Sequence, residues 1–177
     1  VTVPSIDDAL VETGANETLP LTIGGITGTG ALIDNESAQT VSSVSADTQI
    51  EGTSLVHTVT LSSASASATT HSFSLSGVSA TAGLDFSTAA TFSAGVTLAG
   101  GVLTVPAGVT SFTVTVPTLL DTIDEPSETT AIVVGGVSAT GTITDDDLPP
   151  SITTVEPGAP GVGDDAVVEG TSLVYNV

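Results

Sequence analysis

The sequence repeats itself, and the spacing of the repeat limits the fold more than any other feature. The segment Glu51-Gly52-Thr53-Ser54-Leu55-Val56 returns unchanged at 169–174, 118 residues later. The segment Val1-Thr2-Val3-Pro4 returns at 114–117, 113 residues later, and matches between 17 and 36 return between 128 and 147, 111 residues later. Self-similarity at one period marks an array of like domains. The sequence therefore predicts tandem domains of about 110 residues each.

The same matches place the domain boundaries. The last part of one copy is expected in residues 1–36, a complete copy in 37–148, and a linker with the first strands of a third copy in 149–177. The changing offset places length differences in the loop after Pro4 and in the connector after Asp147. Because the chain has no Met and no basic N-terminal region, we expect an internal piece of a longer polypeptide.

Alternating apolar and hydroxyl side chains predict β-strands throughout the complete copy. In Ser111 to Val116 the apolar residues Phe112, Val114 and Val116 share one face, with Ser and Thr on the other. Glycine and proline separate the runs. The expected strands are 40–48, 53–62, 70–78, 88–93, 109–117, 128–134 and 138–145. Seven short strands in this span predict an all-β fold, a Greek-key immunoglobulin-like β-sandwich.

The charge of the chain argues against some classes of binding partner. The chain contains no Lys or Arg and 20 Asp plus Glu, which gives a net charge of −20. Nucleic acids and anionic membranes attract basic surfaces, so neither is an expected partner. No apolar run reaches the roughly 18 residues of a membrane span, so membrane insertion is not expected. Without Cys, a metal ion is the available staple.

The acidic residues fall at the ends of the expected strands. If successive strands alternate in direction, the loops carrying them and the end of the last strand meet at one end of the sandwich. Neighbouring carboxylates about 4 Å apart repel by roughly 1 kcal/mol in water and about 4 kcal/mol near a protein surface. A hard cation with six to eight oxygen ligands relieves this repulsion, and Ca²⁺ tolerates irregular loops. Zinc and copper fit poorly, because only His57 and His71 are present and both occupy expected strand positions.

Four motifs in the complete copy resemble the Calx-beta family. They are Glu51-Gly52, Ala80-Thr81-Ala82-Gly83-Leu84-Asp85-Phe86, the acidic stretch 121–128, and Asp145-Asp146-Asp147. The resemblance covers Thr40 to Asp147 and implies a Calx-beta-like sandwich that binds Ca²⁺. The implied ligands are Glu51, Asp85, Asp121, the Ile123 carbonyl, Glu125, Glu128, Asp145, Asp146 and Asp147. Asp124 has no counterpart in the family pattern, and the first copy departs from it with Asp34-Asn35-Glu36.

The chain also resembles the stalk repeats of large secreted bacterial adhesins of the RTX type. The resemblance implies a structural extender, not an enzyme, at the cell surface or secreted, with calcium stiffening the joints between neighbouring repeats of the same chain. Two alternatives stay open. One is a calcium-dependent module that binds a glycan or another surface, and the other is a subunit that assembles with other cell-surface or filament subunits by strand exchange.

An enzymatic role is not expected from the residues present. Sugar clefts in sandwiches usually carry aromatic side chains, and the chain has no Trp and one Tyr, Tyr175. No Gly-x-Ser-x-Gly motif is present. Several acids outside the central cluster fit an ordinary turn role as well as a ligand role, namely Asp7, Asp8, Glu12, Glu17, Asp164 and Asp165. The glycosylation patterns at Asn16 and Asn35 are left open.

Overall fold

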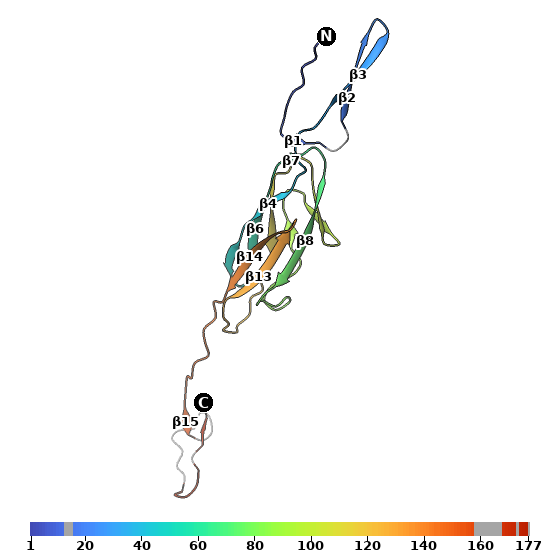
Figure 1. Ribbon diagram of the computed structural model, residues 1–177. Helices are drawn as coiled ribbons and strands as arrows, with labels where there is room; N and C mark the ends of the chain where they lie inside the picture. The colour runs from blue at the N-terminus through green and yellow to red at the C-terminus, as the bar shows by residue number, and fades with distance from the viewer. Residues whose placement is uncertain (13–15, 158–167, 173, 177) are drawn as a thin grey trace. The chain divides into compact units, whose positions relative to one another are not determined.

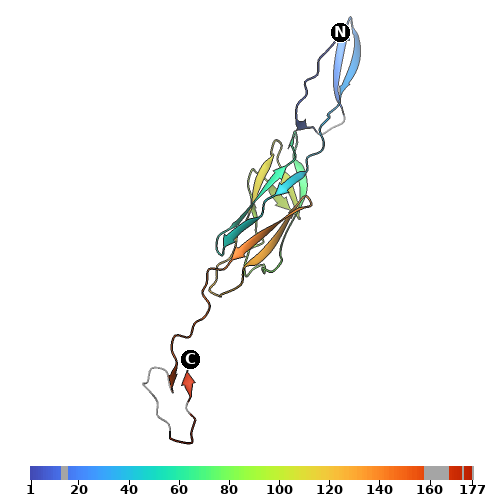
Figure 2. The ribbon, with the colours of Figure 1, turned by 60° about the vertical axis from the view of Figure 1, so that its left-hand side comes forward.

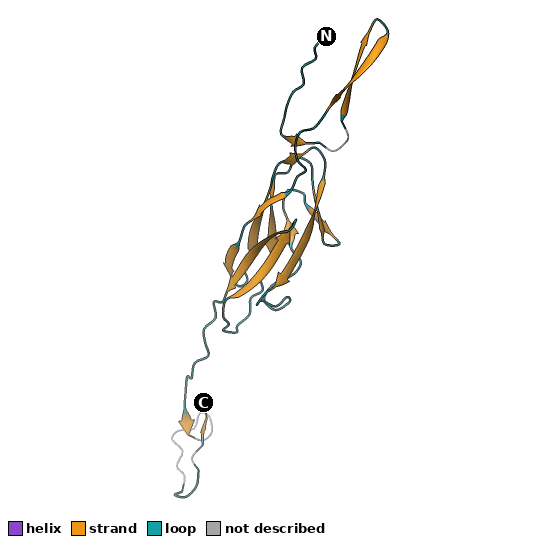
Figure 3. Ribbon diagram, in the orientation of Figure 1, coloured by secondary structure: helices purple, strands orange, loops and turns teal. Residues whose placement is uncertain are grey.

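The computed structural model describes residues 1–12, 16–157, 168–172 and 174–176. They belong to two compact units. The first unit comprises Val1–Asp121 and Pro126–Asp146, and the second comprises Thr122–Glu125 and Asp147–Val177. Every regular element in the described ranges is a β-strand (Figure 3). The described part of the chain holds no helical segment with the length and hydropathy of a membrane span. Asp164 and Asp165 lie outside the described residues.

One sheet of the sandwich has four antiparallel strands. Its order is β4 (Val41–Val44), β6 (Leu55–Leu61), β12 (Ser111–Val116) and β9 (Thr91–Phe92). Burial alternates along β6 and β12. Their Thr and Ser residues face outward, and the inward positions are apolar except for His57, while Val56 is exposed. This period of two is the geometry of a strand with one buried face.

The other sheet has six strands, in the order β10 (Thr97–Ala99), β11 (Val102–Val105), β8 (Thr69–Gly77), β13 (Glu128–Val134), β14 (Val137–Thr144) and β5 (Asp47–Ile50). All neighbours are antiparallel except β14 and β5, which are parallel. Figure 1 shows β8, β13 and β14 side by side, and Figure 2 gives a second view of the two sheets.

The core lies between the two sheets. Phe86, Leu55 and Ile132 are fully buried, and Phe73 and Phe92, from opposite sheets, meet edge to face with ring centroids 5.3 Å apart. Further buried side chains come from both sheets: Val59, Leu61, Leu103, Val105, Phe112, Val114, Val116, Val134 and Ile143. The expected all-β sandwich is therefore confirmed.

The strand expected at 40–48 is wrong as a single element. Its first half, β4, pairs with β6, whereas its second half, β5, pairs with β14 in the other sheet. The chain changes sheets at Ser45, whose backbone N–H donates to the Thr58 carbonyl (2.9 Å) and whose carbonyl contacts Nδ1 of His57 (2.7 Å). The pattern of side chains alone does not reveal such a change, because the change depends on which strand each half pairs with.

The β10–β11 hairpin was not expected from the sequence, and the strand expected at 88–93 is reduced to β9. Gly100 and Gly101 form the hairpin turn, both with positive φ (57° and 78°), which is the geometry of a two-residue type I′ turn. In the sequence these glycines indicate only a break between strands. Each of the other expected strands overlaps a strand of the structure.

The Asp47 side chain stabilises strand β5 through hydrogen bonds. Its Oδ2 accepts a hydrogen bond from the Val56 N–H (2.7 Å) and its Oδ1 accepts one from the Thr48 N–H (2.9 Å). The Val56 bond lowers the pKa of this carboxyl most, and the Gln49 amide and the Thr48 bond lower it further. Asp47→Ala is expected to lower the free energy of unfolding by about 1–3 kcal/mol at pH 7, because it leaves these donors without an acceptor.

The pH dependence of this effect follows from the direction of the shift. Because the folded pKa lies below the ordinary 3.8, the stabilisation is present above pH 3.8 and is lost as the pH falls through the lowered value. Denaturant unfolding at pH 7 and at pH 3 measures it. Asp47→Asn is the control, since it keeps an acceptor oxygen and removes the charge. An equal loss for Asp47→Ala at both pH values would contradict this account.

The segments before and after the sandwich carry short ladders of their own. In the first unit, β1 (Leu10–Val11) pairs in parallel with β7 (Ala64–Ser65), and β2 (Glu17–Ile23) forms a hairpin with β3 (Ile26–Leu32). In the second unit, β15 (Glu156–Pro157) pairs with β16 (Tyr175–Asn176). The division of the chain into parts of three copies stays a prediction.

Candidate metal centre

Three loops and the end of β14 meet at one end of the sandwich. The Glu51 N–H donates to the Thr144 carbonyl (3.0 Å), and the Thr118 hydroxyl donates to the Thr53 carbonyl (2.9 Å). The Leu119 N–H donates to the Asp85 carbonyl (2.9 Å). These bonds fix the connection after β5, the loop after β8 and the segment after β12 against one another. We call this end of the first unit the acidic pole.

Glu51 lies at the centre of the acidic pole. It is half-buried in the turn after β5, which continues through Gly52 with φ of +70°. A Cβ at Gly52 would lie 3.2 Å from Cβ of Leu120, so this position favours glycine on both counts. The Asp121 N–H donates to Oε2 of Glu51 (3.3 Å), and the two side chains bring carboxylate oxygens within 4.8 Å of each other.

Asp145, just past β14, completes a group of three carboxylates. Its Oδ1 is buried and has no hydrogen-bond partner among the described residues. Burial raises the pKa of Glu51, and the charge of Asp121, together with the hydrogen bond and charge of Asp145, raises it further. The ion-free acidic pole therefore holds its carboxylates against both desolvation and like-charge repulsion.

Asp85 and Glu128 form a second pair. Their side chains also bring carboxylate oxygens within 4.8 Å of each other. The Thr81 N–H donates to the Asp85 carboxylate, and the Asp85 N–H returns a bond to the Thr81 carbonyl (3.0 Å). Thr81 was not expected to hold a ligand in place; the four-residue spacing from Thr81 to Asp85 is the signal that could have found it. Phe86 anchors the same loop in the core.

The remaining expected ligands are divided between the two units. Asp146 belongs to the first unit and is exposed. Ile123, Glu125 and Asp147 belong to the second unit, together with Asp124, and their roles stay predictions. His57 and His71 occupy strands β6 and β8, as expected, and are buried.

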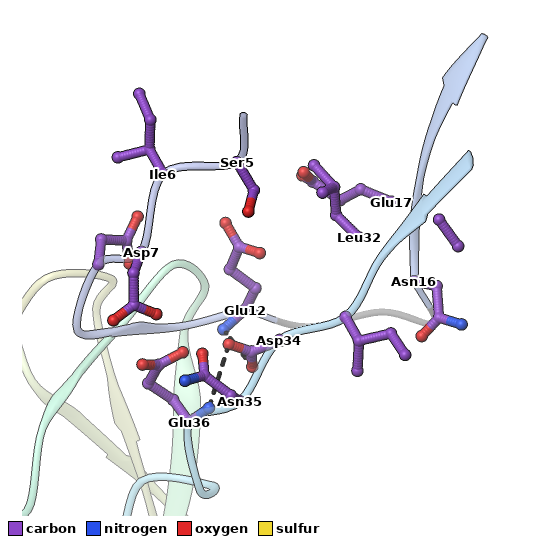
Figure 4. Close-up of a pocket in the computed structure, with 13 residues that line it drawn as sticks. Ser5, Ile6, Asp7, Glu12, Asn16, Glu17, Leu32, Asp34, Asn35 and Glu36 are labelled. Carbon is purple, nitrogen blue, oxygen red and sulfur yellow. Dashed lines mark hydrogen bonds between the residues drawn. The ribbon is translucent and has the colours of Figure 1, made fainter. Parts of the chain in front are cut away.

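A second acidic group lies within residues 1–36, where the sequence left the role of several acids open. Six acids line a hollow of about 610 Å³ (Figure 4). The Glu12 N–H donates to Oδ2 of Asp34 (3.2 Å). The charge of Glu17 raises the pKa of Glu12, and a hydrogen bond with Asp34 raises the pKa of Glu36. The six acids are Asp7, Asp8, Glu12, Glu17, Asp34 and Glu36.

The donor set of the acidic pole suits one kind of ion. Two oxygens that bind one Ca²⁺ at about 2.3–2.6 Å each lie at most about 5 Å apart, and the paired carboxylates meet that limit. The chain has no Lys or Arg to neutralise them and no Cys to favour a softer metal. The buried Oδ1 of Asp145 is an acceptor that a cation would satisfy. The residues present therefore fit a hard, oxygen-binding cation.

The comparisons with known proteins concern the fold alone. No family model matches the sequence, and no curated protein matches it. Among solved structures, the chain is similar to the apo-form CBD1 domain of Calx, with 20% identity and a TM-score of 0.48 over 62% of this chain and 98% of that domain. It is also similar to CBD12 of CALX1.2 and to the calcium binding domain CBD12 of CALX1.1, with 21% and 20% identity and TM-scores of 0.46. These alignments cover 62% and 63% of this chain but only 45% and 47% of those chains.

Proposed function

We propose that the acidic pole binds Ca²⁺ and that the chain is a calcium-binding structural repeat. The observation that carries the proposal is the group formed by Glu51, Asp121 and Asp145. Two of these carboxylates approach within 4.8 Å, and the third has a buried oxygen without a hydrogen-bond partner in the described chain. The sequence contains no Lys or Arg to neutralise them. A divalent cation supplies the missing charge.

The proposed ligand set follows from chain connectivity as well as from the observed groups. Glu51, Asp121 and Asp145 form one group, and Asp85 and Glu128 form the other. Residues 122–125 are tied at both ends to Asp121 and Pro126, and Asp146 and Asp147 follow Asp145 directly. Each peptide step spans about 3.8 Å, so these residues stay within reach of the acidic pole. The further proposed ligands are the Ile123 carbonyl, Glu125, Asp146 and Asp147.

Calcium at this place would stiffen a joint. Ligands from three loops and from the end of β14 would be cross-linked by the ion, and the connector Leu148-Pro149-Pro150 leaves directly from that end. Consecutive prolines favour an extended, semi-rigid linker. We therefore propose that the chain acts as an extender of a secreted or cell-surface bacterial adhesin of the RTX type, in which bound calcium rigidifies the junction between neighbouring repeats.

Calorimetric titration with Ca²⁺ tests the binding site. Glu51→Gln is expected to weaken calcium binding by about tenfold or more, because calcium affinity depends on the number of charged ligands. Glu169→Gln is the matched control, since Glu169 stands in the same six-residue segment within the incomplete third copy. We expect the control to bind calcium as the unaltered chain does. No heat of binding in the unaltered chain, or equal affinities for the two variants, would refute the proposed site.

Assembly by strand exchange is a second candidate, and an exposed hairpin favours it. The β2–β3 hairpin matches β13–β14 at an offset of 111 residues, but Ile23 and Ile26 are 59% and 79% exposed, whereas their counterparts Val134 and Val137 are buried and half-buried. An apolar strand face without a covering sheet is suited to pairing with another chain. Light scattering across a concentration series would show growing assemblies if strands exchange, and a constant monomer mass if they do not.

A further inference from the structure

The short strand β1 has one edge on the sandwich. The Val11 carbonyl accepts hydrogen bonds from the Ala66 N–H (2.7 Å) and from the Ser65 hydroxyl (3.3 Å). Val11 and Ser65 are only 6% and 2% exposed. The pairing is parallel, with Leu10 opposite Ala64 and Val11 opposite Ser65. The two-residue contact between β1 and β7 is therefore shielded from solvent and has a defined register.

The other edge of β1 is held by carboxylates. The Leu10 N–H donates to Oδ1 of Asp8 (2.8 Å), and the Glu12 N–H donates to Oδ2 of Asp34 (3.2 Å), as Figure 4 shows for the second of these bonds. In an extended strand, the N–H and C=O of one residue point to the same side, and those of the next residue point to the opposite side. The backbone N–H and C=O groups of residues 10 and 12 thus face the acids, while those of Val11 face the sandwich.

The receiving strand β7 is braced by the sandwich itself. The Gly108 N–H donates to the Ser65 carbonyl (2.9 Å). The buried side chain of Gln39 donates to the Ser63 carbonyl (2.7 Å) and to the Val109 carbonyl (3.1 Å). β7 is therefore a fixed edge, to which a strand from outside can add without rearranging the core.

We infer that the β1–β7 ladder is the docking contact between successive copies of the sandwich. The acidic loop of one copy, residues 8–12 or 121–125, adds a parallel strand to β7, or to the equivalent of β7, in the copy that follows. The inference rests on the tandem arrangement contained in the proposed function. The complete copy carries the same loop, because Asp121, Ile123 and Glu125 match Asp8, Leu10 and Glu12 at an offset of 113. The partner of Ile123 and Asp124 is then the β7 strand of a further copy.

The alternation of backbone direction gives both Ile123 and Asp124 a role in this assignment. Ile123, like Leu10, would turn its carbonyl toward the acids, where it is a proposed calcium ligand, and Asp124, like Val11, would turn its carbonyl toward the neighbour. Calcium would then bind the carbonyl of one residue of the strand, and the neighbouring copy would bind the carbonyl of the next residue.

Hydrogen exchange at the Ala66 amide tests the contact in the full chain. We expect this amide to be protected, and Asp34→Ala to speed its exchange by about tenfold, because the loss of one hydrogen bond loosens β1. Asp34→Asn keeps an acceptor oxygen and should restore protection, and Glu17→Gln, which changes the charge equally without touching β1, should leave it unchanged. An unprotected Ala66 amide, or identical exchange in Asp34→Ala, would overturn the inference.

Engineered disulfides test which strand pairs with Leu10 and which strand pairs with Ile123. The chain has no Cys, so Leu10→Cys with Ala64→Cys should close a bond, since paired strands about 4.8 Å apart satisfy disulfide geometry. The full chain can be extended after Val174 by residues 57–148, which completes the third copy. Ile123→Cys should then bond to a Cys at the position in that copy equivalent to Ala64, and not to one at the position equivalent to the exposed Thr104.

The outcomes separate this inference from the calcium proposal. If the first disulfide closes and the second does not, docking by Ile123 and Asp124 is overturned. Calorimetry on the same extended chain reports calcium binding independently, so a failure of the acidic pole to bind Ca²⁺ would be seen even where the disulfides form.

Discussion

Removal of calcium with EGTA is expected to lower the free energy of unfolding by about 2.7 kcal/mol for each ion lost, when free calcium stands at about one hundred times its dissociation constant. The physical reason is the grouping of Glu51, Asp121 and Asp145, whose charges repel once the ion is gone. Denaturant unfolding in calcium and in EGTA measures the difference. Mg²⁺ is the control and should replace calcium poorly, because it demands a more regular octahedron of ligands.

The sign of the pH dependence gives a sharper form of this prediction. In EGTA, the raised pKa of Glu51 means that its contribution to stability is present below the ordinary value of 4.5 and is lost as the pH rises through the raised value. With calcium, the ion binds the ionised carboxylate, so stability should rise over the same pH range. If unfolding curves with and without calcium coincide at every pH, the acidic pole does not bind the ion.

Phe86→Ala is expected to lower the free energy of unfolding by about 3–5 kcal/mol, the usual cost of removing a fully buried aromatic side chain. The effect should extend to the acidic pole. Phe86 pairs with Thr118 across an isolated bridge, and the adjacent Asp85 carbonyl accepts the Leu119 N–H, so the loop carrying Asp85 is anchored through this side chain. We expect weaker calcium binding together with the loss of stability.

Leu84→Ala provides the control for this variant. Leu84 lies two residues away in the same loop and is 66% exposed, so its removal should change stability by no more than about 0.5 kcal/mol. Denaturant unfolding and calorimetry on both variants measure the two effects. If calcium binds the folded Phe86→Ala variant with unchanged affinity, the Asp85 loop is not positioned by its anchor in the core.

The fold class followed from local pattern because a sandwich strand with one buried face must alternate. Phe112, Val114 and Val116 show this directly, as each is buried and each was expected inward. The grouping of the acids at one end likewise followed from the alternating direction of the strands, since Glu51, Asp121 and Asp145 lie in different connections yet meet. Neither conclusion required knowledge of distances between the strands.

Other features could not be read from the sequence because they depend on partners distant along the chain. The break at Ser45 is visible only once β14 supplies a parallel neighbour for β5. The glycines at 100 and 101 become a hairpin turn only because Val102 to Val105 find β8. The strand β1 is too short to show any periodicity, and it exists because β7 offers it an edge.

The sequence by itself determined the recurrence of its own segments, the all-β class, the oxygen-only chemistry of the acidic residues and the absence of Lys and Arg to neutralise them, because each is a property of composition or spacing. Only the tertiary structure decided which carboxylates meet, that Thr81 holds Asp85 in place, and that β1 stands between an acidic group and a strand edge. Those facts depend on which backbone groups find hydrogen-bond partners across loops, and no local pattern contains that information.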